Sequence, residues 1–370
     1  MRPITTAFVI NDFSGAGAQK LVADILLRID RTRFKITLVT LFEVKNGATM
    51  YHLLPSDIEV VRMNFTGFFD LGSWIRLYCS LARACPQVVV SHLFFSNVVV
   101  RVLKPIIGYR VITTEHNTYS NKKRVHQFID RILAMWTYAI VAVSTTVKTF
   151  TAAQEGIPLS KFRVIHNGID VAGITAAVYK TDVIAVKKEL GLESARIMIN
   201  VARLNEQKDH ALLLKGFAPL ADQYKDLHLI VLGEGEKKEA LEREAHELGI
   251  SERVHLLGYR NDVYRYYAAS DFFVSTSLIE GFGLAHAEAL VAGLPVLSTK
   301  TAGPDEMVKE GVNGFFISDH TPQAVTEGLK KIMSADLSVM RQQAPISVAR
   351  FDIAVTVKGY EELILEVASS

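Results

Sequence analysis

Long uncharged hydrophobic runs are missing from this sequence of 370 residues. No stretch of about 18 apolar residues occurs, so we expect no transmembrane helix. The first residues, MRPITTAFVIND, become polar too early for a signal peptide. We therefore expect a cytosolic protein.

Cysteine is scarce as well, and a cation-chelating motif is absent. The two cysteines, Cys79 and Cys85, have a spacing that matches no common metal site and makes a structural disulfide improbable. This usage fits a reducing compartment. No Asp-x-Asp sequence occurs that would chelate a cation for a phosphate-containing substrate.

Net charge is also small, at +2, but it is unevenly distributed. Residues 1–170 carry a net charge of +9, and the remaining residues carry −7. The basic half predicts an anionic partner, such as phospholipid or a phosphorylated acceptor. Nucleic acid is the competing interpretation, but no zinc-finger spacing, RNA-binding aromatic signature or dense basic helix supports it.

A hydrophobic content of 49% predicts a folded globular protein, and the length predicts two domains. Short apolar runs alternate with helical patterns, which is typical of doubly wound parallel sheets. We predict strands at Ala7–Asn11, Ile36–Phe42, Ile58–Met63, Gln87–His92, Arg110–Thr114, Ala139–Ser144 and Phe162–His166, and then at Arg196–Val201, Leu227–Leu232, Val254–Leu257, Asp271–Ser275 and Pro295–Ser298. The predicted organisation is a first domain at 1–170, a linker at 171–188, a second domain at 189–345 and a C-terminal helix at 346–370.

Ligands of open parallel sheets bind at the carboxyl ends of the strands. In the second half, the segment Glu280–Glu288 places a carboxylate on each side of a glycine-rich turn that opens a predicted helix. The unpaired N–H groups there are suited to a diphosphate, Glu280 to sugar hydroxyls and Glu288 to a ribose diol. The alternative is a buried turn followed by an ordinary helix.

Two cations follow the first predicted strand of the second half, Arg203 and Lys208. Fixed cations beside a glycine turn would offset the charge of a diphosphate without a metal ion. Gly233, after the next strand, belongs to the same predicted edge. The competing interpretation is a solvated loop with ordinary surface charges.

The first half offers weaker signals. Gly15 and Gly17 follow the first strand and would bring backbone N–H groups to a phosphate. Together with Glu43 they also suggest a nicotinamide-binding fingerprint. Lys20 occupies the third glycine position of that fingerprint, which weakens this interpretation. His116 also ends a strand, where catalytic and structural roles remain open. We expect His92, His166 and His286 to be packing or hinge residues.

The order of these segments resembles the GT-B glycosyltransferases of family 4, also called glycosyltransferase group 1, over nearly the whole chain. The matching stretches are Gly15–Lys20, Glu115–Asn117, Val164–Asp170, Ala202–Lys208, Gly233–Gly235, Leu257–Arg260, Glu280–Glu288, Gly303–Glu306 and Gly311–Gly314. The resemblance implies a retaining enzyme with two Rossmann-like domains and an interdomain cleft. It also implies a nucleotide-sugar donor, UDP-linked by family frequency, with no metal and no resident cofactor.

The resemblance assigns a role to each candidate residue. Arg203 and Lys208 would stabilise the diphosphate, Glu280 and His116 would contact the transferred sugar, and Glu288 would bind the ribose. The implied donor-binding set is Gly15, Gly17, Gly233, Asn261, Val263, Gly281, Phe282, Gly283, Leu284 and Glu288. One departure occurs in the first loop, where Ala16-Gly17-Ala18-Gln19 stands in place of the usual Gly-Gly-Ala-Glu.

The resemblance also implies the reaction, which is the transfer of a hexosyl or N-acetylhexosaminyl group to a glycan or lipid-linked glycan. This acceptor would belong to the synthesis of bacterial surface polysaccharide or glycoconjugate. No histidine lies between residues 1 and 51 to act as the general base of an inverting relative, which favours retention. Family resemblance implies a front-face route in which the departing phosphate helps to deprotonate the acceptor. An inverting GT-B transferase, a non-catalytic nucleotide-sugar-binding subunit and a pyridoxal-phosphate-dependent phosphorylase remain alternatives.

A second hypothesis concerns the membrane. Phe65, Phe68, Phe69 and Trp74, together with Lys122-Lys123-Arg124, would place an apolar and basic face on an anionic bilayer, at the inner face of the cell membrane. A core helix with a solvated loop is the equally supported alternative.

Overall fold

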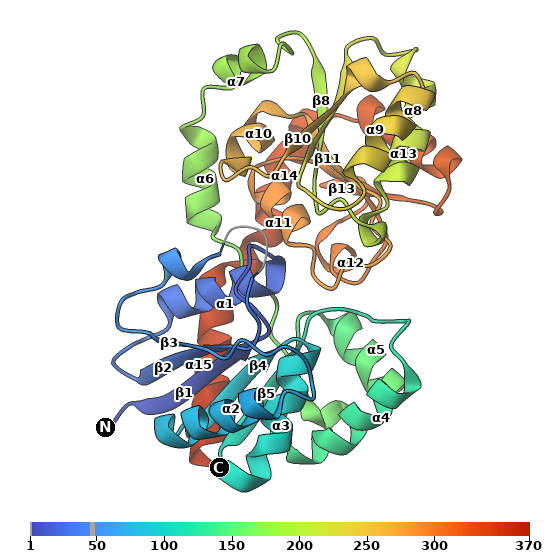
Figure 1. Cartoon of the computed structure of the whole chain (residues 1–370). Coiled ribbons are helices and arrows are strands. Elements are labelled where there is room, and N and C mark those ends of the chain that lie inside the picture. The colour runs from blue at the N-terminus through green and yellow to red at the C-terminus, as the bar shows by residue number, and fades with distance from the viewer. Residues whose placement is uncertain (1, 45–48) are drawn as a thin grey trace. The chain divides into compact units, whose positions relative to one another are not determined.

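The computed structural model describes residues 2–44 and 49–370 (Figure 1). The chain forms two compact units. The first consists of Met1–Gly168 together with Ile353–Ser370, and the second consists of Ile169–Asp352. None of the helices in the described ranges has the length and hydropathy that crossing a bilayer would require.

The first unit is built on a seven-stranded parallel sheet in the order β3-β2-β1-β4-β5-β6-β7. Its strands are β1 (Ile4–Ile10), β2 (Phe34–Thr40), β3 (Glu59–Arg62), β4 (Val88–His92), β5 (Arg110–Glu115), β6 (Ala139–Ala142) and β7 (Phe162–Val164). Its helices are α1 (Gly17–Arg28), α2 (Leu71–Ala84), α3 (Phe94–Ile107), α4 (Arg124–Leu133), α5 (Thr145–Glu155) and α15 (Ile353–Ser369).

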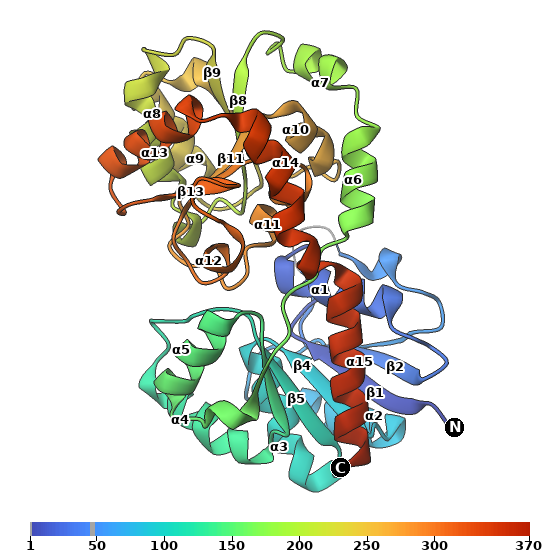
Figure 2. The ribbon, with the colours of Figure 1, turned by 180° about the vertical axis from the view of Figure 1, so that it is seen from behind.

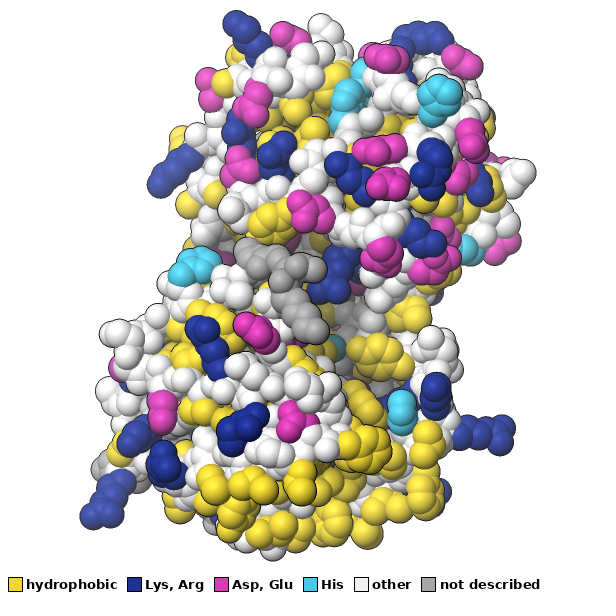
Figure 3. Space-filling view, in the orientation of Figure 1, with side chains coloured by type: hydrophobic (Ala, Val, Ile, Leu, Met, Phe, Trp, Pro, Cys, Tyr) yellow, Lys and Arg dark blue, Asp and Glu magenta, His cyan; other side chains and the backbone are white. Residues whose placement is uncertain are grey.

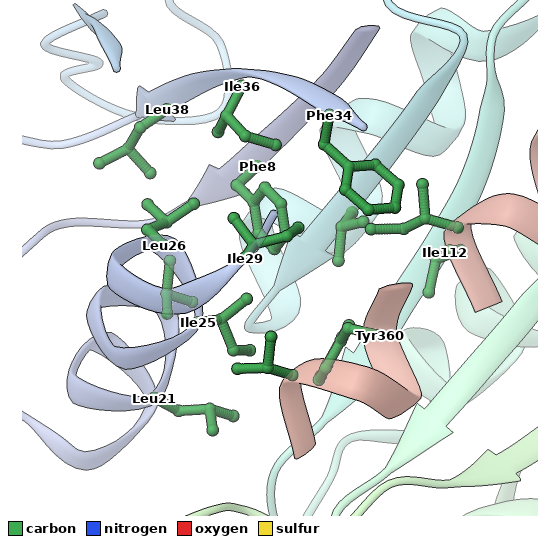
Figure 4. Packing of buried hydrophobic residues seen from close by; sticks show 14 of the residues in the cluster. Phe8, Leu21, Ile25, Leu26, Ile29, Phe34, Ile36, Leu38, Ile112 and Tyr360 are labelled. Atoms are coloured by element: carbon green, nitrogen blue, oxygen red, sulfur yellow. The ribbon is translucent and has the colours of Figure 1, made fainter. Parts of the chain in front are cut away.

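Helices cover both faces of this sheet because alternate residues of each central strand are buried on opposite sides. Phe8 of β1 packs with α1 and α15, whereas Val9 packs with α2 and α3. Figure 4 shows Ile25 of α1 and Tyr360 of α15 pointing into the same core as Phe8. Seen from behind in Figure 2, α15 lies across the strands of the first unit.

The second unit repeats the plan with six parallel strands in the order β10-β9-β8-β11-β12-β13. Its strands are β8 (Arg196–Val201), β9 (Leu227–Leu232), β10 (Val254–Gly258), β11 (Phe272–Ser275), β12 (Val296–Thr299) and β13 (Gly314–Ile317). Its helices are α6 (Val171–Tyr179), α7 (Val183–Glu189), α8 (His210–Ala221), α9 (Lys238–Glu247), α10 (Val263–Ala269), α11 (Leu284–Val291), α12 (Pro304–Met307), α13 (Pro322–Ser334) and α14 (Leu337–Val348).

Both sheets reverse their strand order at one place, between β1 and β4 in the first unit and between β8 and β11 in the second. Ligands of open α/β sheets bind outside the carboxyl ends of the strands at such a switch point. In the second unit the loops that leave this point carry Arg203 and Lys208 after β8, and Glu280 after β11. The doubly wound, GT-B-type architecture predicted from the sequence is confirmed.

Three details differ from the sequence predictions. The structure has an additional strand, β13, which begins with Gly314 directly after a glycine-containing turn and so has an apolar run of only three residues. The segment predicted as a linker holds α6 and α7, because Asp170 and Asp182 cap these helices by accepting from the N–H groups of Gly173 and Ala185. The predicted helix from residue 346 is interrupted, since α14 ends at Val348 and α15 begins at Ile353.

Candidate functional site

The loops after β8 and β9 are bonded to each other along the carboxyl edge of the second sheet. Ala202 N–H donates to Leu232 C=O at 3.0 Å, and Leu204 N–H donates to Glu234 C=O at 2.9 Å. At Gly233 a Cβ atom would lie 1.9 Å from the Ala202 carbonyl oxygen, and its φ is +143°. Only glycine allows this approach of the two loops, which fixes the backbone on which Arg203 is carried.

Lys208 and Glu280 meet at the switch point. The Lys208 Nζ atom lies 2.5 Å from Oε1 of Glu280, and the hydroxyl of Ser277 donates to the same oxygen at 2.9 Å. Both charged side chains are largely shielded, with exposed fractions of 18% and 13%. Burial alone would raise the pKa of the Glu280 carboxyl, but the Lys208 ammonium group and the Ser277 hydroxyl help to hold that pKa below its ordinary value. Glu280 is therefore a carboxylate at neutral pH.

Two hydrogen bonds join the segments that carry Lys208 and Glu280. Leu278 N–H donates to the Gln207 C=O at 2.8 Å, and the Gln207 side chain donates to the Ile279 C=O at 2.8 Å. These bonds cross between the turn before α8 and the loop after β11. Because neither charged residue relies on the other alone for its position, the site is preorganised.

Asp209, next to Lys208, adopts a left-handed conformation with φ +41° that is unfavourable for residues other than glycine. Three bonds hold it there. Its carboxylate accepts from Leu212 N–H at 3.2 Å and pairs with His320 Nε2 at 2.8 Å, and its carbonyl accepts from the Thr276 hydroxyl at 2.8 Å. Local strain is thus stored beside the lysine.

The turn after Glu280 presents backbone donors at the start of α11. Among the described residues, the N–H groups of Gly281, Gly283, Leu284 and Ala285 have no hydrogen-bond acceptor. Gly303 N–H donates to the Glu280 C=O at 3.1 Å, and a Cβ at Gly303 would lie 1.8 Å from the Phe282 carbonyl oxygen. Unpaired donors at a helix N-terminus favour an anion.

Four of the predicted donor-binding residues in this segment are buried, namely Gly281, Phe282, Gly283 and Glu288. The Phe282 side chain is 2% exposed and packs edge-on against Phe351 at 5.2 Å, so it anchors the turn. Glu288 is 6% exposed on α11, and its charge adds to burial in raising the pKa of the Tyr267 hydroxyl. The Tyr267 hydroxyl donates to the Ala285 C=O at 3.3 Å, which places Glu288 among the buried groups between α10 and α11.

The other predicted residues of the second unit are more open. The Arg203 side chain is exposed and has no acceptor among the described residues. Asn261 is exposed in the loop after β10, and Val263 is the first residue of α10. Gly233 N–H donates to the Gly258 C=O at 2.9 Å, so this loop leaves the sheet beside Gly233. A diphosphate bound at the edge would find Arg203 available.

The candidate residues of the first unit lie in a different environment. Gly15 is exposed in the loop after β1, and Gly17 is exposed as the first residue of α1. The Asp12 carboxylate in this loop accepts from Ser14 N–H and from the Gln19 side chain, both at 3.0 Å. The hydrogen bonds from Ser14 and Gln19 thus engage the Asp12 carboxylate.

His116 is half-buried after β5, and its Nε2 lies 3.1 Å from Nδ1 of His92. Burial lowers the pKa of His116 to about 4 and holds that of His92 well below its ordinary value. Both rings are therefore neutral at pH 7 and share one hydrogen bond. His116 carries no charge with which to bind an anionic group.

Sequence reasoning missed three residues that complete the site, namely Ser277, Gln207 and Asp209. Ser277 lies three residues before Glu280, and the other two flank Lys208, but no spacing rule identifies them. Their roles follow from the left-handed backbone at Asp209, from the bond of Gln207 to Ile279, 72 residues away, and from the local bond of Ser277 to Glu280. His286, expected to pack, is buried and bonds through Nε2 to the Ser298 hydroxyl at 2.9 Å.

Comparison with known families decides the class of the protein. The model of glycosyl transferases group 1 matches residues 183–345, and that of glycosyltransferase family 4 matches residues 15–172. The chain belongs to the group 1, family 4 glycosyltransferases. The two matches fall on the second and first units, respectively.

Individual glycosyltransferases are similar over much of their length. A D-inositol 3-phosphate glycosyltransferase of Corynebacterium urealyticum is 29% identical over 75% of this chain and 70% of its own length. The UDP-Gal:alpha-D-GlcNAc-diphosphoundecaprenol alpha-1,3-galactosyltransferase of Escherichia coli is 27% identical over 67% of this chain and 66% of its own. The solved structure of Anabaena Alr3699/HepE in complex with UDP-glucose covers 98% of this chain and 100% of its own, with a TM-score of 0.86 and 22% identity, which supports the shared fold.

Proposed function

We propose that this glycosyltransferase moves a hexosyl or N-acetylhexosaminyl group from a UDP-sugar to a glycan or lipid-linked glycan acceptor, with retention of configuration. The names of relatives support the acceptor class. The Escherichia coli relative is named for a diphosphoundecaprenol-linked sugar, as is a Campylobacter jejuni N-acetylgalactosaminyltransferase that is 31% identical over 48% of this chain and 45% of its own length. Such acceptors would place the reaction at the inner face of the cell membrane, in surface polysaccharide or glycoconjugate synthesis.

The observation that carries the proposal is the Lys208–Glu280 ion pair at the switch point of the second sheet. A diphosphate there has Lys208 and the unpaired Arg203 as cations and the N–H groups of the α11 turn as donors. These groups oppose the negative charge that grows as the bond from sugar to phosphate breaks. The proposed binding set needs no metal ion and no resident cofactor, because two cations and fixed dipoles supply the countercharge.

Glu280 has a second role in this proposal. One of its carboxylate oxygens accepts from both Lys208 and Ser277, which leaves the other oxygen for hydroxyl groups of the transferred sugar. Glu288, further along α11, would bind the ribose. His116 of the first unit is proposed to contact the donor sugar as a neutral hydrogen-bonding group.

Retention is proposed because no candidate base fits an inverting displacement. No histidine lies between residues 1 and 51, where inverting relatives carry the base. The departing phosphate would take the acceptor proton on the same face of the sugar. Catalysis then depends on positioning and on the electrostatic stabilisation of the leaving group.

The test has two stages. A panel of nucleotide sugars is screened by thermal shift, because a ligand that binds the folded state raises the melting temperature by mass action. The best donor is then incubated with diphosphoundecaprenol-linked acceptors, and the anomeric configuration of the product is determined by NMR. We expect a UDP-sugar to bind and the product to retain its configuration. An inverted product would identify an inverting enzyme, and binding without turnover would identify a non-catalytic subunit.

A further inference from the structure

The chain from Leu71 to Tyr138 has an extreme charge imbalance. It contains nine Lys and Arg residues and only two acids, Glu115 and Asp130. Both acids are already engaged. Asp130 is 1% exposed and pairs with Arg101 and Lys122, and the half-buried Glu115 accepts from the Asn97 side chain at 3.2 Å. The accessible part of this segment therefore carries positive charge alone.

Several of its cations are exposed and unpaired. Arg83, Lys123, Arg124 and Arg131 form no ion pair with any residue that the structure describes. An exposed cation that is not paired with an acid creates a positive potential that a neutralised pair would not have. The partly exposed Asp70, which caps α2 between Phe69 and Leu71, is an acid that borders this segment. This segment is therefore prepared for an anionic partner.

Helix α4 carries an exposed apolar stripe on the same surface. Val125, Phe128, Ile132 and Met135, the last just beyond the helix, are 56%, 62%, 38% and 70% exposed. Their spacing of three and four residues places them on one face, while Asp130 is buried on the other. Helix α4 thus exposes an apolar face beside the exposed cations Arg124 and Arg131 and buries Asp130, whereas an ordinary surface helix buries its apolar face.

A second exposed apolar group begins at the turn before α2. Phe69 is 96% exposed at the tip of this turn. Its neighbour Phe68 packs edge-on against Trp74, whose indole N–H donates to the Phe68 C=O at 2.6 Å. The aromatic cluster therefore holds Phe69 outward in the described structure, next to Leu71, which is also exposed.

These groups adjoin because α3 packs against both α2 and α4 in the first unit (Figure 1). Figure 3 shows hydrophobic side chains gathered along the lower edge of this unit. We name this surface the α2–α4 face, and its exposed apolar residues are Phe69, Leu71, Ile75, Tyr78, Val102, Ile106, Val125, Phe128, Ile132 and Met135. An exposed apolar surface of this extent on a folded unit indicates an interaction site.

We infer that the α2–α4 face docks the protein on the surface of an anionic lipid bilayer. Aromatic and aliphatic side chains would enter the interfacial region while Lys123, Arg124 and Arg131 meet lipid phosphates. A second copy of this chain fits less well, because two such faces would bring cations against cations. Only the biological role of docking, which is to bring the enzyme to a lipid-linked acceptor, rests on the proposed function.

The structure also revises which residues take part. Phe65 is only 5% exposed in the core, and Lys122 lies among Asp130 and Glu155, so neither reaches a bilayer. Phe68, Phe69, Lys123 and Arg124 from the sequence-based hypothesis are exposed on the surface. In the α2–α4 face, the exposed apolar residues of α4 take the place of Phe65 and Lys122.

Co-sedimentation with vesicles tests the inference with the full chain. Vesicles of phosphatidylcholine alone are compared with vesicles that contain 30% phosphatidylglycerol, at low salt and at high salt. We expect binding to the anionic vesicles, weakened at least about tenfold by high salt, since the charge attraction is screened. The double variant Phe128→Glu/Met135→Glu should bind at least about tenfold more weakly. Lys123→Glu/Arg124→Glu should lose the preference for anionic lipid.

Matched controls separate these effects from damage to the fold. Tyr179→Glu/Ile184→Glu makes the same apolar-to-acid change at exposed positions of the second unit, and Lys225→Glu/Lys358→Glu makes the same charge reversal elsewhere. Both controls should bind vesicles as the wild type does. Each variant is also checked by circular dichroism and by UDP binding in calorimetry.

Two outcomes overturn the inference. One is that wild-type protein binds neither type of vesicle, and the other is that the α4 variants bind as well as their controls. Self-association that the α4 variants abolish, without any vesicle binding, would assign the face to a second copy instead. UDP binding reports separately on the second unit. Vesicle binding without UDP binding would reject the proposed function and leave the docking face standing.

Discussion

The two units share one sheet topology and use its carboxyl edge in different ways. In the second unit, the edge holds the Lys208–Glu280 ion pair, an exposed and unpaired Arg203 and a turn with unpaired N–H groups. In the first unit, His116 and His92 at the edge form a hydrogen-bonded pair of neutral rings. The same architecture thus carries charged side chains at one edge and a neutral histidine pair at the other.

The exposed surfaces of the two units also differ in how their charged side chains are paired. The first unit exposes cations and apolar side chains on α2 and α4, whereas the second unit exposes mostly mixed charges in pairs, such as Lys215–Glu244 and Lys331–Glu310. The comparison teaches that topology fixes where a ligand can bind, whereas the side chains on the loops fix what chemistry each edge offers.

The largest expected effect comes from the cations of the second unit. Lys208→Ala and Arg203→Ala should each lower kcat by about a hundredfold or more, because the charge that develops on the diphosphate is left unmatched. UDP release measured by a coupled assay gives the rate. Lys215→Ala, an exposed lysine on α8, is the control and should retain wild-type turnover. Near-wild-type turnover of Lys208→Ala would remove this residue from the mechanism.

The next effect is expected at Glu280. Glu280→Gln keeps the size of the side chain but loses the ion pair with Lys208, and we expect turnover to fall by about ten- to a hundredfold with little change in melting temperature. Glu244→Gln, which also loses a lysine partner, is the matched control. If Glu280→Gln melts the protein while Glu244→Gln does not, the role of Glu280 is structural.

The buried charge cluster of the first unit predicts a pH-dependent stability. Arg101 and Lys122 face Glu115, Asp130 and Glu155, so the acids outnumber the cations. Burial, then the charge of Glu115, raises the pKa of the Glu155 carboxyl to about 7. A raised carboxyl pKa means that the folded state holds a proton that the unfolded state has released.

The stability that Glu155 contributes is therefore present below about pH 4.5 and is lost as the pH rises through about 7, by at most about 3 kcal/mol. Glu155→Gln, which mimics the protonated form, should lose less stability than the wild type between pH 5 and pH 8. Urea unfolding at several pH values measures this. The exposed Glu362→Gln should follow the wild type. Parallel curves for wild type and Glu155→Gln would contradict the proposed protonation.

The smallest effect is expected at the strained residue beside Lys208. Asp209→Ala loses the helix cap and keeps an unfavourable left-handed backbone, whereas Asp209→Gly relieves the strain. We expect the alanine variant to be less stable than the glycine variant by about 1 kcal/mol. The equilibrium urea midpoint of each variant gives the difference. Equal midpoints would show that Asp209 is not under strain.

Much of the fold could be predicted from the sequence because parallel strands that are buried on both faces form short, nearly continuous apolar runs. β8 and β9 were predicted with their observed bounds, Arg196–Val201 and Leu227–Leu232. β13 was missed because it begins with Gly314 directly after a glycine-containing turn, which leaves only three apolar residues, Phe315–Ile317, to show a pattern. α6 and α7 were missed because their formation depends on aspartate caps within a polar segment.

The prediction of the site was more limited. Lys208 and Glu280 could be identified because each follows a predicted strand, and strands of one parallel sheet end at one edge. Their direct contact depends on the strand order, which no local pattern reveals, whereas the hydrogen bond from Ser277 to Glu280 joins residues three apart in one loop. The buried Phe282 and the strained Asp209 are likewise set by packing between distant segments.

Calorimetric titration of UDP tests the central claim most directly, because the claim is that the cations of the second unit bind the diphosphate. Wild-type protein and Lys215→Ala should bind UDP with the same affinity, and the double variant Arg203→Ala/Lys208→Ala should bind at least about a hundredfold more weakly. Wild-type affinity in the double variant, with its fold intact by circular dichroism, would contradict the account.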